Sequence, residues 1–172
     1  LRIRSAKAKG LKQGAATGFD YTVERRDRTV YFSSLRNGEK ENFFGAVIAF
    51  SPVNQSLTAH HLDLKSAEGA VLEVSLQGVT AVDHRVAVRF NGSDLGEIAF
   101  AALQQGIARL NVRHGAIREG QNVVTLTSTG GESDVSLVDA LRLSYRQAYT
   151  ADGDALRFTA AGKRVLTVDG FT

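Results

Sequence analysis

The chain has 172 residues, of which 43% are hydrophobic and 23% are charged, and it contains a single Pro, no Cys and no Trp. This length and composition favour one globular domain with an adequate core and argue against a disordered chain. The lack of Cys excludes a disulfide scaffold, a thiolate metal site and a Cys nucleophile within these residues.

The net charge of +3 would suit a polyanionic partner if the basic residues formed a patch on the domain. Residues 1–28 hold eight Lys or Arg and three Asp or Glu, whereas the remaining 144 residues hold 13 basic and 15 acidic side chains. The excess is therefore confined to one terminal segment, and Lys7, Lys9 and Lys12 have no aromatic neighbours that could stack on bases. A nucleic-acid partner is therefore not expected. Membrane insertion is not expected either, because no apolar run reaches about 18 residues.

Composition and turn signals divide the chain into three parts. Residues 1–18 read as a basic connector, 19–150 as the main domain, and 151–172 as a β-hairpin appendage that leads to a following domain. Because the sequence contains no Met and starts at Leu1, we expect it to be a piece of a longer polypeptide.

The first expected elements are two short strands over 19–23 and 29–33, rich in aromatic and β-branched residues. The charged stretch 24–28 between them suits a turn, so a hairpin is predicted. Further along, Phe43 and Phe44 are adjacent on a strand and must face opposite ways.

The strongest pattern is the stretch 84–100, in which two alternating strands flank Asn91-Gly92, a pair typical of a tight hairpin turn. The same period of two recurs before it over 70–76 and after it over 135–145. This patterning predicts an all-β fold, an antiparallel two-sheet β-sandwich.

Asp139 interrupts the last of these alternating strands. Strict alternation places its carboxylate on the apolar face with Leu137, Leu141 and Leu143, where it needs a partner. A hydrogen bond to loop backbone and coordination of a structural Ca²⁺ are both open.

Two other groups contain residue types that can bind metal ions. His60 and His61 are adjacent on an expected strand and would face opposite sides, so they cannot chelate one ion together. Asp152-Gly153-Asp154 is similar to the start of a calcium loop but lacks the remaining ligands, so we expect a turn.

Several sequence segments, taken in their order along the chain, resemble a non-catalytic β-sandwich region of large secreted bacterial cysteine peptidases of the gingipain type. They are ENFFGA at 41–46, LEVSLQGVT at 72–80, HRVAVRFNGSDLGEIAF at 84–100, REGQNVVTLT at 118–127 and SLVDALRLSYRQAY at 136–149. The resemblance implies a secreted or cell-surface protein in which this region precedes the peptidase domain. No catalytic motif of that family occurs here, so an accessory domain rather than an enzyme is expected.

The same pattern also resembles galactose-binding-like jelly rolls, the fold of many carbohydrate-binding modules. That resemblance implies a glycan ligand at a cell surface or in a matrix and a structural calcium, for which Asp139 is the candidate ligand. Because the chain has no Trp, the sugar contact would have to come from Tyr21, Tyr31 and Tyr149. The alternative is an interaction or spacer domain that docks against a neighbouring peptidase domain and binds no small ligand; an independent enzyme is the third alternative.

Overall fold

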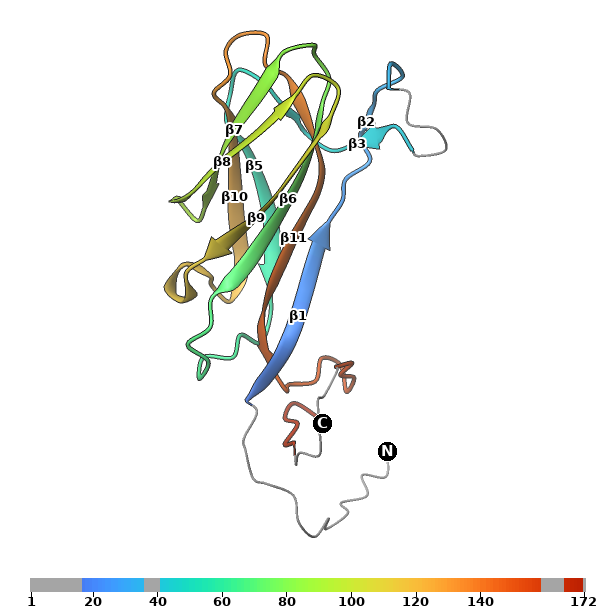
Figure 1. Ribbon diagram of the computed structural model, residues 1–172. Helices are drawn as coiled ribbons and strands as arrows, with labels where there is room; N and C mark the ends of the chain where they lie inside the picture. Colours follow the sequence, from blue (N-terminus) through green and yellow to red (C-terminus); the bar gives the residue numbers. More distant parts are fainter. Residues whose placement is uncertain (1–16, 36–40, 159–165, 172) are drawn as a thin grey trace.

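The computed structural model describes residues 17–35, 41–158 and 166–171, and it consists of two antiparallel sheets packed face to face (Figure 1). The first sheet contains, in spatial order, β1 (Gly18–Arg25), β11 (Ser136–Ala148), β6 (Ala70–Gly78) and β9 (Gln105–Val112), with β4 (Val47–Ile48) also paired to β11. The second sheet contains β5 (Val53–Ala59), β10 (Gly120–Ser128), β7 (Asp83–Phe90) and β8 (Ser93–Ala101). The predicted two-sheet sandwich is confirmed.

A small third sheet and one short helix complete the described fold. β2 (Val30–Tyr31) pairs with β3 (Phe43–Phe44), and a single 3₁₀ turn, η1 (His114–Ala116), connects β9 to β10. Within the described ranges, no helix has the length and apolar character needed to cross a membrane.

The core lies between the two sheets and is built from the inward positions of each alternating strand. On the first sheet these include Leu72, Val74, Leu141 and Leu143, and on the second sheet Val86, Val88, Phe90, Val124 and Leu126, all with 0% of their surface exposed. The core therefore follows the period of two along every long strand, because successive side chains on a strand point to opposite faces.

The hairpin predicted around Asn91-Gly92 is present. Asn91 and Gly92 have φ angles of 49° and 85°, the left-handed values that a tight turn between β7 and β8 requires. The Asn91 amide also donates to the carbonyl of Ala116 and to the side chain of Asn122, which ties this turn to the connection before β10.

The hairpin predicted for residues 19–33 is wrong. β1 continues through Arg25 and pairs along its whole length with β11, more than a hundred residues away in the sequence, while β2 pairs with β3. The first two charged residues of the stretch that suggested a turn, Glu24 and Arg25, are instead strand positions, and Glu24 lies opposite Arg142 and forms an ion pair with it. A favourable cross-strand charge pair thus replaces the local turn.

A buried ion pair holds together the loops at the upper end of the sandwich in Figure 1. His84, at the start of β7, and Asp134, in the loop before β11, have fully buried side chains, and their Nδ1 and Oδ1 atoms are 2.6 Å apart. The other ring nitrogen, Nε2, lies 2.8 Å from the carbonyl oxygen of Ala102 and 3.2 Å from that of Thr80. Both ring nitrogens therefore face hydrogen-bond acceptors, so contacts on two sides hold the imidazole in place.

Asp134 is the matching anion. Burial raises the pKa of its carboxyl, but hydrogen bonds from the Arg85 backbone N–H and from His84 outweigh burial and hold that pKa below its usual value. The Gly130 N–H donates to the same carboxylate at 3.1 Å. The pair therefore links three loops, 79–82, 102–104 and 129–135, into one rigid end.

The opposite end of the sandwich is where β1 begins and β11 ends (Figure 1). There Phe19, Tyr149 and Phe158 pack together, with ring centroids 5.1–5.8 Å apart, and Thr150 bridges to Asp169. The predicted connector lies almost entirely in residues 1–16, and much of the predicted hairpin lies in residues 159–165, outside the described residues. The predicted turn at 152–154 is present, with Asp152 and Ala155 exchanging backbone hydrogen bonds.

We expect His84→Ala to lower the free energy of unfolding by about 3–5 kcal/mol, because it leaves the buried Asp134 carboxylate without its cation. The measurement is equilibrium unfolding in urea. His60→Ala is the matched control, since the His60 side chain is 62% exposed and should change stability by no more than about 0.5 kcal/mol. Equal losses in the two variants would contradict a buried ion pair.

Candidate functional site

A polar hollow lies on the outer face of the first sheet, near its upper end. This Asp139 cleft has a volume of about 720 Å³, within the range of small-molecule sites. It is lined by Arg26, Arg28, Glu41, Phe44, Gln77, Leu103, Gln105 and Asp139. Strands β1, β11, β6 and β9 each contribute to it or end beside it, so it is formed by the sheet rather than by a single loop.

The Asp139 carboxylate is the hub of the cleft. Its Oδ2 accepts hydrogen bonds from the Ser75 hydroxyl at 3.1 Å and from the Gln105 amide at 2.9 Å. Its Oδ1 lies 3.3 Å from the Arg26 guanidinium and 3.7 Å from that of Arg28. The side chain is 13% exposed, so the carboxylate is fixed in place yet open to the cleft.

The predicted face of Asp139 is wrong, and the hydrogen-bond donors to its carboxylate are the side chains of Ser75 and Gln105 rather than loop backbone. The pairing of β11 with β6 shifts by one residue between Val138 and Ala140, a β-bulge. One extra residue reverses the alternation, so Val138 faces the core while Asp139 faces outward. Leu137 also faces outward, where it packs with Leu35 and Phe44 in a second, smaller apolar cluster.

The surroundings of Asp139 do not fit a calcium ion. Ca²⁺ binds six to eight oxygen ligands, several of them anionic. The groups around Asp139 are a hydroxyl, an amide N–H₂ and two guanidinium groups, which are mostly donors and cations. Among the residues that the structure describes, no three His, Cys, Asp or Glu side chains lie close enough together to hold a metal ion.

The three tyrosines predicted to contact sugar are not brought together. Tyr21 lies on β1 and is 40% exposed, and Tyr31 lies on β2 and is 61% exposed, beside Phe43 at a centroid distance of 5.0 Å. Tyr149 is only 6% exposed, because Phe19 and Phe158 pack on its ring. The prediction that the Tyr149 ring is accessible to a sugar is therefore wrong. No tyrosine lines the Asp139 cleft.

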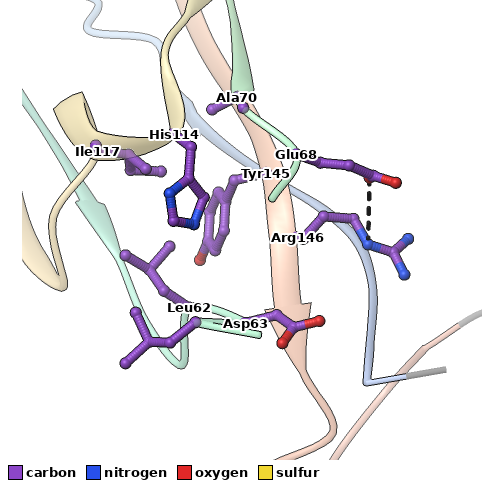
Figure 2. A pocket seen from close by; sticks show the side chains of 11 residues that line it. Leu62, Asp63, Glu68, Ala70, His114, Ile117, Tyr145 and Arg146 are labelled. Carbon is purple, nitrogen blue, oxygen red and sulfur yellow. Dashed lines mark ion pairs between the residues drawn. The ribbon is translucent and has the colours of Figure 1, made fainter. Parts of the chain in front are cut away.

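A second hollow, which we call the end pocket, lies at the lower end of the sandwich and measures about 240 Å³ (Figure 2). Its walls are formed by Leu62, Ala70, Ile117 and the rings of His114 and Tyr145, and its rim carries Leu64, Asp63 and the ion pair of Glu68 with Arg146. The Tyr145 hydroxyl is held between the backbone N–H and C=O of His60, and burial raises the pKa of this phenol. The pocket is therefore mainly apolar, and hydrogen bonds hold the Tyr145 ring that lines it in place.

The sequence alone did not identify most of these residues. Gln77 and Gln105 are outward positions of two alternating strands, a pattern that predicts solvent exposure and nothing more. Gln77 lies opposite Gln105 in the sheet, and its amide donates to the Leu103 carbonyl at 2.7 Å. Their grouping with Asp139 depends on the order of the strands in the sheet, which no local motif encodes.

The fold and cleft define a β-sandwich domain with a polar hollow on one outer face. No protein-family model matches this sequence, and no curated protein does either. Among solved structures, the chain is similar to a region of dimeric latent PorU from Porphyromonas gingivalis, with a TM-score of 0.60 and 10% identity over 87% of this chain. This chain spans only 14% of that protein.

Carbohydrate-binding modules are also among the similar structures. One is a CBM36 module in complex with calcium and xylotriose, with a TM-score of 0.45 and 14% identity over 72% of this chain and 98% of that one. Another is CBM35 from Cellvibrio japonicus Abf62, with a TM-score of 0.44 and 15% identity over 78% of this chain and 96% of that one. At these identities the likeness concerns the fold alone. The two packed sheets of this chain and its likeness to the PorU region confirm the sandwich fold that the resemblance implied.

We expect Asp139→Ala to lower the free energy of unfolding by about 1 kcal/mol, because the Ser75 and Gln105 donors lose their acceptor but remain within reach of water. Thermal and urea unfolding measure this loss, with the exposed Glu132→Ala as control. EDTA should leave the melting temperature of the wild type unchanged. A melting temperature that falls with EDTA and recovers with Ca²⁺ would overturn the conclusion that the cleft does not fit calcium.

Proposed function

We propose that the chain is a non-catalytic accessory domain of a longer secreted or cell-surface protein and that it binds uncharged carbohydrate in the Asp139 cleft. The observation that carries this proposal is the set of polar groups in the cleft. They include donors, acceptors and both signs of charge, and Asp139 and Gln105 are already fixed by hydrogen bonds to each other and to Ser75. Groups held in place before binding lose little freedom when a ligand arrives.

Sugar hydroxyls both donate and accept hydrogen bonds, so they match such a mixed set of groups. Two cations, Arg26 and Arg28, are balanced by two anions, Glu41 and Asp139, which favours an uncharged ligand over an anion or a cation. Leu103, with 45% of its surface exposed, provides an apolar contact for the carbon face of a sugar ring.

The affinity should be weak. The cleft offers no Trp or Tyr ring, and each neutral hydrogen bond contributes only about 0.5–1.5 kcal/mol net, so a dissociation constant of roughly millimolar to high micromolar is expected. A module with such affinity works best beside other modules on the same chain, which raise its effective concentration.

The test is NMR titration of the isolated domain with a panel of uncharged oligosaccharides. We expect saturable shifts that are lost in Asp139→Ala and weakened at least threefold in Gln105→Ala. Gln121→Ala, an amide on the outer face of the second sheet, should bind like the wild type, as should Tyr21→Ala and Tyr31→Ala.

If binding is lost only in a tyrosine variant, the sugar site lies at that ring and the cleft assignment fails. If no oligosaccharide perturbs any resonance at millimolar concentration, the carbohydrate function itself fails.

The second candidate is a domain that docks against its neighbour in the same polypeptide, and the end pocket favours it. This apolar pocket lies where β1 begins and β11 ends (Figures 1 and 2). Leu64 at its rim is 80% exposed, which is unusual for a large apolar side chain beside a pocket. The occupant would be an apolar side chain of the neighbouring domain, flanked by a basic group facing Asp63 and Glu68.

Hydrogen–deuterium exchange of this domain alone and within its full-length polypeptide tests docking. Residues 62–70 and 114–117 should exchange at least tenfold more slowly in the full-length protein, because a covered pocket opens less often. The loop 129–133, at the other end of the sandwich, serves as the internal control and should exchange equally in both. Equal exchange at the pocket would contradict docking there.

A further inference from the structure

A second polar hollow lies on the same outer face of the first sheet as the Asp139 cleft. This Glu73 hollow measures about 490 Å³ and is lined by Thr22, Val71, Glu73, Arg109, Arg142 and Ser144. On β6, the outward residues run from Gln77 in the cleft through Ser75 to Glu73 and Val71 in the hollow. On β9 they run from Gln105 through Ile107 to Arg109.

The two hollows therefore lie on cross-strand rows of one sheet face, with a single row between them. The register pairs Gln77 with Gln105, Ser75 with Ile107, Glu73 with Arg109 and Val71 with Asn111. Rows on one face are two residues apart, and at about 3.4 Å per residue the four rows cover about 20 Å along the strands. A single sugar ring would fill only one of the hollows.

Hydrogen bonds fix the polar groups of the Glu73 hollow as firmly as those of the cleft. Glu73 accepts from Arg109 at 2.8 Å and from Arg142 at 2.6 Å, and these two contacts hold the pKa of its carboxyl below the usual value. Arg142 also reaches Glu24 on β1, and the hydroxyls of Thr22 and Ser144 are 2.7 Å apart. Glu24, Arg142, Glu73 and Arg109 thus form a chain of ion pairs across four strands, which is in place before a ligand binds.

The charges in and beside the two hollows cancel. The cations Arg26, Arg28, Arg109 and Arg142 are matched by Glu24, Glu41, Glu73 and Asp139, and each of the eight takes part in at least one ion pair. Between the hollows, Ile107 is 59% exposed and offers an apolar contact flanked by polar rows. Alternating polar and apolar contacts without net charge suit the successive units of an uncharged polysaccharide.

We infer that the outer face of the first sheet binds an extended segment of a linear, uncharged polysaccharide, which runs along the strands from the Glu73 hollow into the Asp139 cleft. This inference rests on the proposed function and adds the ligand's form: an internal stretch of several sugar units, not a chain end or a monosaccharide. Binding of internal units requires a surface open at both ends, and both hollows lie on a sheet face rather than in a closed cavity.

Titration calorimetry and NMR with ladders of xylo-, cello- and manno-oligosaccharides, from disaccharide to hexasaccharide, test the inference. In the ladder that binds, affinity should rise about tenfold or more with length, and the backbone amides of Ser75 and Ile107 should shift only with the longer members. Arg109→Ala should weaken hexasaccharide binding about three- to tenfold and leave disaccharide binding unchanged.

Arg85→Ala is the matched control, because Arg85 forms a similar cross-strand pair with Glu97 at 3.2 Å on the second sheet. It should leave binding of every oligosaccharide unchanged. Affinity that does not change with length, together with loss of disaccharide binding in Asp139→Ala, would overturn the extended-chain inference while the proposed function stands. Absence of binding along all three ladders would overturn both.

Discussion

The bulge in β11 is the constraint on which the rest of the first sheet's outer face depends. β11 pairs with β1, β4 and β6, so a shift of one residue between Val138 and Ala140 changes which side chains its neighbours meet. It turns Leu137 outward, where Leu137 with Leu35 and Phe44 anchors the small β2–β3 sheet beside the cleft. It also turns Asp139 outward, into the group of donors contributed by β6 and β9. One inserted residue thus produces both the wall and the hub of the cleft.

The two ends of the sandwich are organised by different interactions. At the upper end, the buried pair of His84 and Asp134 fixes three loops through charged hydrogen bonds, and His84 stacks on Phe100 with ring centroids 4.8 Å apart. Gly78 is needed there, because a Cβ at that position would lie 2.6 Å from His84 Nε2. At the lower end, aromatic rings around Tyr149 provide the packing. A rigid upper end keeps the strands that form the cleft in register.

Local patterns in the sequence predicted the features that depend on neighbours in the chain. Asn91-Gly92 fixed a hairpin because its turn chemistry is contained in two residues, and the period of two identified most inward residues. Adjacent Phe43 and Phe44 face opposite ways as expected, with 44% and 4% of their surfaces exposed. Secondary structure and fold class were accessible for this reason.

Features that depend on distant pairing were not accessible. A charged stretch such as 24–28 reads equally well as a turn or as the end of a strand, and only the presence of Arg142 across the sheet decides for the strand. The face of Asp139 required knowledge of a bulge that has no Gly or Pro to mark it. The burial of Tyr149 depends on Phe158, which returns over its ring after the turn at 152–154.

The candidate cleft and the end pocket lie at opposite ends of the sandwich. The cleft lies near the upper end of the first sheet, whereas β1 begins and β11 ends at the lower end (Figure 1). A neighbour that docks at the end pocket would therefore not compete with a ligand on the sheet. Weak binding at an exposed face and a connection at the opposite end are compatible in one rigid domain, because tethering raises the effective concentration of such a face near an extended polymer.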